Sequence, residues 1–241
     1  MSESGARAVA RMFDRMAEAI EAEKDHLSEL DGAIGDGDHG ITMSIGFKAA
    51  NAALAQLNLD AASPSDVMST AAAAFLDAVG ASTGPLYATG FQRAAQVLAG
   101  RDKLDLPACR DMLVAISEGI ANRGKAQRGD KTMLDVWLPA AGAASAAITE
   151  GRSKQDFWKA VTAAADNGAA ATATMIATKG RAARLRERSL GHLDPGAVSA
   201  AALVRAMAAA LSPKGSIVWP SVHRTQTLRS IGECRADLAS T

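Results

Sequence analysis

Val9-Ala-Arg-Met-Phe-Asp-Arg-Met-Ala-Glu-Ala-Ile20 is the stretch that decides the fold class. Its large apolar residues recur at intervals of three and four positions and are Val9, Met12, Phe13, Met16 and Ile20. Residues with that spacing share one face of an α-helix, whereas a half-buried strand would alternate apolar and polar residues. The stretch therefore predicts an amphipathic helix with one buried face.

The same helical period continues along the chain, and glycine, proline and polar clusters interrupt it. Alanine is abundant, and three Trp, one Tyr and five Phe residues are the only aromatic ones, which favours closely packed helices over strands. Ser63-Pro64 and Asp194-Pro195 each place a capping side chain before a proline, which is tolerated at the first helical position. The predicted helices are residues 6–29, 40–57, 64–80, 85–99, 106–123, 132–148, 153–178 and 195–211.

Eight helices with mostly short connections predict an all-α fold of antiparallel neighbours. No linker divides the first 211 residues, so residues 1–211 are expected to form one domain. Residues 212–241 differ from the rest, with two prolines and scattered Trp219, His223 and Arg224. We interpret them as a C-terminal tail of unassigned role.

Composition excludes several classes of function. The 241 residues are 48% hydrophobic, which is ample for a packed core, and 26 basic residues balance 26 acidic ones. That balance removes the electrostatic reason to expect binding to nucleic acid or to an anionic membrane.

The chain starts without an apolar signal core and has no apolar span near about twenty residues, so a cytoplasmic protein is expected. Cys109 and Cys234 lie far apart and suggest neither a disulfide framework nor a zinc site.

Asp31-Gly-Ala-Ile-Gly-Asp36-Gly-Asp38-His39-Gly40 holds the densest chemistry of the chain, in the connection between the first two predicted helices. Crowded carboxylates repel one another and raise one another's pKa, so their convergence favours a bound divalent cation. Oxygen ligands indicate Mg²⁺ or Ca²⁺. The alternative is a glycine-rich turn in which Asp38 caps the following helix, and it explains one acid but not three.

Two familiar motifs are excluded by the same loop. Gly35-x-Gly37-x-x-Gly40 matches the dinucleotide-binding spacing, but a helix precedes it and its acids would repel a pyrophosphate. The helix-loop-helix Ca²⁺ pattern fails because Phe47 stands where the bidentate glutamate belongs. A metal that joins the carboxylates to nucleotide phosphates accounts for both the acids and the glycines. The chain has no GxxxxGK[ST] or protein-kinase motif, so such a site belongs to neither common class.

Six blocks in the same order resemble the nucleotide-binding L subunit of dihydroxyacetone kinases, over roughly residues 5–211. They are Ile34–Gly40, Gly80–Tyr87, Arg123–Ala126, Gly129–Trp137, Lys179–Ala182 and Glu187–Gly196. Several ordered blocks are more specific than any one of them. The resemblance implies an up-and-down barrel of eight antiparallel helices, with a nucleotide across one end.

The resemblance also implies the site residues. Asp31, Asp36 and Asp38 would hold two Mg²⁺ ions and, with Arg181, would carry catalysis. The residues implied to bind ADP or ATP are His39, Gly40, Ile41, Thr42, Ser82, Thr83, Gly124, Met133, Arg181, Asp194, Pro195 and Gly196. Thr42 stands where the family often has asparagine, and Lys131 is a weaker candidate for a second positive charge.

Several of these residues also have a structural interpretation, and the sequence leaves both open. Ser82 and Thr83 can cap the helix that follows them, and Asp194 can cap the last helix. Met133 can be an ordinary core residue. Arg181 can be a solvated member of a basic run.

The function implied by the resemblance is phosphoryl transfer to a sugar that a separate K subunit holds through a histidine. The chain alone would then bind nucleotide but phosphorylate nothing. Its phosphoryl donor is either tightly bound ADP, which a phosphohistidine protein of the sugar phosphotransferase system recharges, or ATP that exchanges as a substrate. The separate L chain and the His39 that follows Asp38 favour the first arrangement. The alternatives are the L subunit of a tetrulose kinase and a non-catalytic coregulator module, and a homodimer is a further expectation.

Overall fold

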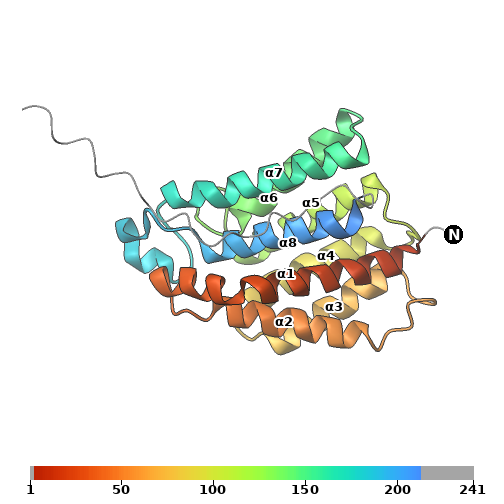
Figure 1. The fold of residues 1–241 in the computed structure, drawn as a ribbon, viewed down its shortest axis with the longest axis horizontal. Helices are drawn as coiled ribbons and strands as arrows, with labels where there is room; N and C mark the ends of the chain where they lie inside the picture. Colours follow the sequence, from red (N-terminus) through yellow and green to blue (C-terminus); the bar gives the residue numbers. More distant parts are fainter. Residues whose placement is uncertain (1–2, 213–241) are drawn as a thin grey trace, which may run out of the picture.

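The computed structural model describes residues 3–212, and all regular structure within them is helical (Figure 1). The eight α-helices of that range are α1 (Gly5–Ile34), α2 (His39–Leu54), α3 (Pro64–Ala78), α4 (Thr83–Leu98), α5 (Leu106–Gly124), α6 (Leu134–Thr149), α7 (Lys154–Ala171) and α8 (Pro195–Leu211). Two 3₁₀ segments, η1 (Thr172–Thr174) and η2 (Ala182–Ser189), lie between α7 and α8. The all-α prediction is confirmed, and the tail prediction lies outside the described residues from 213 onward.

The helices form a closed ring. Each α-helix packs against its neighbours in sequence, and α8 packs against both α7 and α1. Figure 1 shows the helix axes lying roughly along one direction, with the chain reversing at each connection. The predicted up-and-down barrel is therefore confirmed, and its connections gather at the two ends.

Aromatic side chains fill the barrel between α1 and α4. Phe13, Phe47, Phe75 and Phe91 come from four successive helices and are fully buried. The rings of Phe13 and Phe91 meet edge to face at 5.2 Å between centroids, as do those of Phe47 and Phe75. Such pairs contribute about 0.5–1.5 kcal/mol beyond their burial. This packing fixes α2 and α4 relative to each other, and both helices begin at the same end of the barrel.

Helix α8 is buried along nearly its whole length. Its sequence is rich in alanine, so α1, α6 and α7 can all approach it closely. The N-terminus of α8 is capped by Asp194, whose side chain accepts a hydrogen bond from the N–H of Ala197, and Pro195 occupies the first helical position, as the sequence predicts. The start of α8 is therefore held firmly at one end of the barrel.

Two predicted helix boundaries are wrong. Helix α1 continues to Ile34 instead of ending near 29, which places Asp31 on its last turn. Helix α7 ends at Ala171, whereas the sequence predicts helix to 178. The carbonyl groups that follow it, at Thr172 and Met175, accept hydrogen bonds from the side chain of Lys131. These carbonyl groups accept a tertiary hydrogen bond from Lys131, and the chain beyond Ala171 does not continue as an α-helix.

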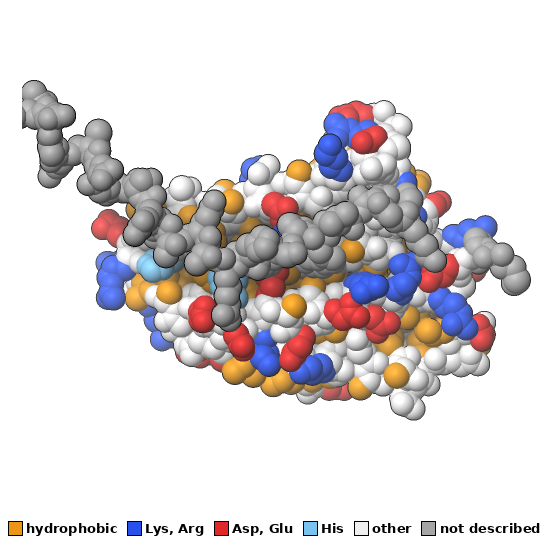
Figure 2. Space-filling model, in the orientation of Figure 1, with side chains coloured by type: hydrophobic (Ala, Val, Ile, Leu, Met, Phe, Trp, Pro, Cys, Tyr) orange, Lys and Arg blue, Asp and Glu red, His pale blue; other side chains and the backbone are white. Residues whose placement is uncertain are grey.

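Acidic and basic side chains are interspersed over the face shown in Figure 2. No helix among residues 3–212 is both long enough and apolar enough to cross a bilayer.

Candidate functional site

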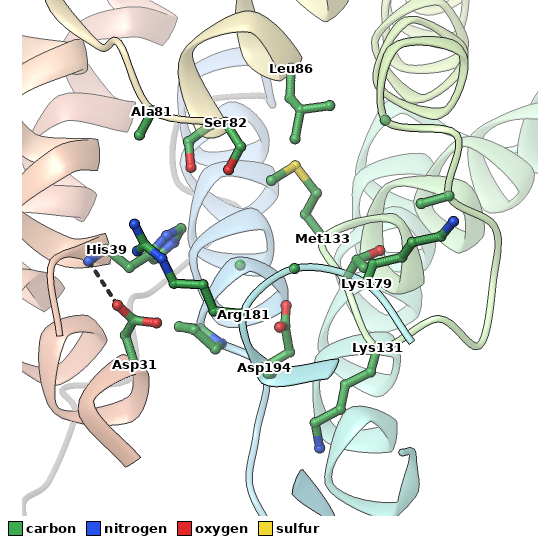
Figure 3. A pocket seen from close by; sticks show the side chains of 18 of the residues that line it. Asp31, His39, Ala81, Ser82, Leu86, Lys131, Met133, Lys179, Arg181 and Asp194 are labelled. Carbon is green, nitrogen blue, oxygen red and sulfur yellow. Dashed lines mark hydrogen bonds between the residues drawn. The ribbon is translucent and has the colours of Figure 1, made fainter. Parts of the chain in front are cut away.

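A cavity of about 760 Å³ opens at the end of the barrel where α1 finishes and where α2, α4 and α8 begin. The α5–α6 connection and residues 179–184 complete its wall (Figure 3). The residues singled out in the sequence that line it are Asp31, Asp38, His39, Thr42, Ser82, Thr83, Gly124, Lys131, Met133, Arg181, Asp194, Pro195 and Gly196. The structure thus brings most of the implied site together, and Asp36, Gly40 and Ile41 lie outside the lining.

Three carboxylates meet at one side of this cavity. Asp31, Asp36 and Asp38 each offer an oxygen, and these atoms all lie within 4.8 Å of one another. Asp31 Oδ2 accepts hydrogen bonds from the main-chain N–H groups of Asp38 at 3.0 Å and His39 at 3.3 Å, which ties the end of α1 to the start of α2. Asp38 occupies the N-cap position of α2, but its side chain makes no capping hydrogen bond. The simple turn interpretation of Asp38 is therefore wrong.

Arg181 reaches these acids from the segment before η2. Its guanidinium pairs with the Asp36 carboxylate and lies 3.6 Å from Asp38 Oδ1. Burial and the nearby Asp36 carboxylate raise the pKa of Asp38, while Arg181 opposes this rise. The Arg181 side chain is more than half exposed to solvent, and its guanidinium group is directed toward the two carboxylates. The geometry shows a cluster of negative charge that attracts cations.

His39 links α2 to α8 beneath the acids. Its Nε2 lies 2.9 Å from Ser199 Oγ, and that hydroxyl donates to the carbonyl of Gly196 at 3.0 Å. Because the Ser199 proton is used there, His39 Nε2 is the donor in the first bond and Nδ1 carries the lone pair. Burial lowers the pKa of His39, and Asp31 opposes this shift. The imidazole is therefore a neutral part of the cavity wall.

The first turn of α2 lies very close to α1. A Cβ atom added at Gly40 would sit 1.9 Å from the carbonyl oxygen of Lys24, so only glycine fits. Thr42 lines the cavity. Ile41 does not, because its side chain is 52% exposed and belongs to a separate surface hollow between α1 and α2. Any contact of Ile41 with a ligand in the cavity would use its main chain.

Ser82 and Thr83 stand at the start of α4, on the opposite wall. Ser82 is the N-cap residue, but its side chain makes no capping hydrogen bond, so capping does not explain the serine. Thr83 is buried in the first turn. Figure 3 shows Ser82 across the cavity from Arg181 and His39. Two hydroxyl groups thus face the same space as the acids.

The other end of the cavity is apolar. Met133 and Leu86 face each other there (Figure 3), and Ile120 and Ala126 lie beside them. A Cβ at Gly124 would approach Leu86 to 3.0 Å, so the glycine leaves room at this end. Sequence reasoning selected Met133 and Gly124 but missed Leu86, Ile120 and Ala126. Their apolar character matches that of core residues, and no sequence signal separates the two roles.

Asp194 combines two roles. It caps α8, as its structural interpretation states, and it also lines the cavity. Burial raises the pKa of Asp194 to about 7, while the Ala197 N–H and Lys131 oppose the rise. Lys131 also lines the cavity, but its ammonium is bound by main-chain carbonyls and is not directed at the three acids as the sequence suggests.

Known proteins are similar to this chain in sequence and in fold. Residues 33–209 match the family model described as the DAK2 domain. A protein of Listeria innocua, "PEP-dependent dihydroxyacetone kinase 1, ADP-binding subunit DhaL", is 39% identical over 82% of this chain and 92% of its own length. A D-erythrulose kinase of Mycolicibacterium smegmatis is 34% identical over 85% of this chain but only 35% of its own length.

A solved structure is also similar to this chain. The dihydroxyacetone kinase from C. freundii in complex with AMP-PNP and Mg²⁺ superposes with a TM-score of 0.64 at 25% identity, over 83% of this chain and 33% of that one. This chain therefore spans nearly all of the Listeria subunit but about a third of the two longer kinases. The resemblance found in the sequence blocks is confirmed, and the chain belongs to the DAK2 domain family.

Proposed function

We propose that this chain is the nucleotide-binding subunit of a dihydroxyacetone-type kinase, which holds ADP or ATP with Mg²⁺ and passes a phosphoryl group to a sugar on a separate K subunit. The observation that carries the proposal is the cavity itself. Three carboxylates converge at one end, two of them in the cavity lining, and an apolar wall of Leu86, Ile120 and Met133 stands at the other. A nucleotide has the same polarity, with charged phosphates at one end and a base at the other.

The acids fit a magnesium site. Mg²⁺ prefers oxygen ligands, and Asp31, Asp36 and Asp38 present carboxylate oxygens within 4.8 Å of one another. They would hold the two ions that the family resemblance implies. When bound, Mg²⁺ supplies positive charge that neutralises the phosphate oxygens. Phosphoryl transfer depends mainly on such neutralisation and on positioning.

The chain's own side chains complete the phosphate end. Arg181 already points at the acids and would add positive charge beside the phosphates. The hydroxyl groups of Ser82 and Thr83 face the same space from α4. The first N–H groups of α2, at Gly40 and Ile41, lie at a helix N-terminus, which favours anions. These groups orient the nucleotide and leave its end open for a partner.

The sugar is expected to come on another protein. Among the described residues, the histidine in this cavity is His39, and its Nε2 is occupied by Ser199. The family resemblance implies that the histidine that holds the sugar belongs to the K subunit. The chain alone should bind nucleotide without phosphorylating a substrate.

Fixed ADP, recharged by a phosphohistidine protein of the sugar phosphotransferase system, is the favoured donor arrangement. It is supported by the name of the Listeria relative, which is PEP-dependent and ADP-binding and matches over 92% of its length. Exchanging ATP and a tetrulose substrate form the second candidate, supported by the match to a D-erythrulose kinase. That match covers about a third of the longer protein, so it carries less weight.

Nucleotide content tests the proposal directly. The protein is purified without added nucleotide and denatured, and released ADP and ATP are quantified, with Asp36→Ala as the control. Stoichiometric ADP that is lost in the variant supports the fixed cofactor. An empty wild type that binds ATP with Mg²⁺ favours the exchanging kinase. No nucleotide binding in the presence of Mg²⁺ overturns the proposal. Tight binding without transfer to any K subunit favours the coregulator module.

A further inference from the structure

Lys131 is a charged side chain that the proposed chemistry does not use. It is 1% exposed, and its main chain has a φ of 60°, a left-handed conformation that is uncommon outside glycine. Its ammonium has three N–H groups and lies within hydrogen-bond distance of four carbonyl oxygens, so one N–H is shared between two of them. These are the carbonyl oxygens of Thr172 at 2.7 Å, Met175 at 3.2 Å, Ser189 at 2.8 Å and His192 at 2.5 Å. Two of these carbonyls lie near one end of the α7–α8 connection and two near the other. One ammonium therefore holds both ends of residues 172–194 together.

A second set of bonds ties the middle of the same connection to the neighbour of Lys131. The Thr178 hydroxyl donates to Asp130 Oδ1 at 2.6 Å, and the Thr178 N–H donates to the Asp130 carbonyl at 3.2 Å. Asp135 fixes the loop itself, because it accepts hydrogen bonds from the N–H groups of Gly129 and Thr132. Residues 125–133, which we call the anchor loop, and residues 172–194, which we call the closing segment, thus form one cross-linked unit.

This unit spans the cavity from end to end. The anchor loop carries Met133 at the apolar end, and the closing segment carries Arg181 at the acidic end. Figure 3 shows Lys131 pointing away from the cavity while Met133 and Arg181 point into it. The connection between α7 and α8 has only short 3₁₀ pieces of its own, so its shape depends on these tertiary bonds.

We propose that Lys131 is a positioning residue, which sets Arg181 at a fixed distance from Met133 and so controls how long the nucleotide stays bound. The inference rests on the proposed nucleotide function. Without the ammonium, four main-chain carbonyls lose a charged donor. The two ends of the closing segment then keep neutral hydrogen bonds, from the Gly191 N–H to the Ala173 carbonyl and from the Asp194 N–H to Thr172 Oγ1, and are held less firmly. Arg181 then reaches the phosphates only part of the time, and its contribution to binding falls.

A merely structural lysine would behave differently, and a double-mutant cycle separates the two roles. Lys131→Met keeps the length of the side chain and removes its charge. Arg181→Met removes the guanidinium that Lys131 is proposed to position. Ser82→Ala serves as the matched control, because Ser82 lines the same cavity from the N-cap position of α4 and belongs to neither the anchor loop nor the closing segment. The dissociation constant and dissociation rate of ADP with Mg²⁺ are measured for each single variant and for both pairs.

We expect Lys131→Met to speed ADP dissociation about tenfold or more, because the carbonyl groups of the closing segment lose hydrogen bonds to a charged donor. The loss caused by Arg181→Met should shrink about fivefold or more in the Lys131→Met background, since the guanidinium is no longer held in place. The loss caused by Ser82→Ala should be the same in both backgrounds. Additive effects of Lys131→Met and Arg181→Met, or equal coupling to Ser82, would overturn the inference.

Hydrogen exchange of the nucleotide-free protein gives an independent readout. Amides of the closing segment should exchange faster in Lys131→Met, while those of α2 to α5 keep their wild-type rates. Uniformly faster exchange would mean a general loss of stability and would refute a positioning role. If Lys131→Met does not fold, Thr178→Val replaces it, because this variant removes the hydrogen bond from the Thr178 hydroxyl to Asp130. It should show the same exchange pattern more weakly. Exchange rates and an ADP affinity equal to those of the wild type would refute the inference. A wild type that binds no ADP overturns both proposals, whereas a binding wild type without coupling overturns only this one.

Discussion

Gly40→Ala should disable the acidic end of the cavity while leaving the barrel folded. The added methyl group would lie 1.9 Å from the Lys24 carbonyl oxygen and 2.8 Å from Ser28 Oγ. Real Cβ contacts essentially never fall below 3.0 Å, so α1 and α2 must separate locally by about 1.1 Å, the difference between 3.0 and 1.9. The carbonyl belongs to the α1 backbone and cannot swing aside as a side chain would. The strain therefore falls on the junction of the two helices.

That junction is where the three carboxylates converge. Asp31 ends α1, and Asp36 and Asp38 precede α2, so separating the helices spreads oxygens that now lie within 4.8 Å. Mg²⁺ demands ligands at about 2.0–2.1 Å in nearly ideal geometry. A misplacement of about 1 Å at a reacting centre costs on the order of a hundredfold in rate. We expect a comparable loss of affinity for ADP with Mg²⁺ and a stability loss of about 1–3 kcal/mol from overpacking.

Calorimetric titration and urea denaturation measure the two effects, and Gly142→Ala is the matched control. Gly142 lies inside α6, and an added Cβ there would meet nothing within 4 Å. That variant should gain about 0.5–1 kcal/mol of stability, as expected for alanine replacing glycine within a helix. Its nucleotide affinity should be unchanged. A Gly40→Ala protein that binds ADP and Mg²⁺ like the wild type would refute the close-approach reasoning.

Three further variants test separate parts of the site. Ser82→Ala should change the free energy of unfolding by less than about 0.5 kcal/mol, because the side chain makes no capping bond, yet weaken ADP binding; a clear stability loss with unchanged affinity would restore the capping interpretation. Arg181→Met should strengthen binding of Mg²⁺ alone, because its guanidinium competes for Asp36 and Asp38, but weaken binding of ADP with Mg²⁺; titrations showing the same direction for both would contradict this. Asp194→Asn tests the buried carboxyl, whose pKa rises from 3.8 to about 7 on folding. The proton bound in the native state stabilises it fully below pH 4, and this contribution is lost as the pH rises through 7. Denaturation from pH 4 to 8 should therefore show the wild type losing stability relative to the variant, and parallel curves would refute the shifted pKa.

The sequence by itself determined the helical class and the number of helices and, with the family resemblance, thirteen of the 26 residues that line the cavity. Helical periodicity is a local property, and so are the Ser63-Pro64 and Asp194-Pro195 starts, so both could be read without the fold. The metal prediction also rests on neighbouring residues, because three carboxylates within one short stretch favour a bound cation. Arg181, Met133 and Gly124 were reached only through a family resemblance, since their residue types are compatible with ordinary surface or core positions.

Only the tertiary structure decided which side chains face the cavity and which bonds hold its wall. Ile41 was assigned to the site, but its side chain lies on the outer face of α2, while Leu86 and Ile120 line the cavity. Lys131 was read as a charge for the phosphates, but its ammonium joins carbonyls that are 41 to 61 residues away. Two of these carbonyls, at Thr172 and Met175, directly follow the end of α7 at Ala171, whereas local periodicity predicts helix to 178. Hydrogen bonds between segments far apart in the chain leave no periodic trace in sequence, and they join the closing segment to the anchor loop.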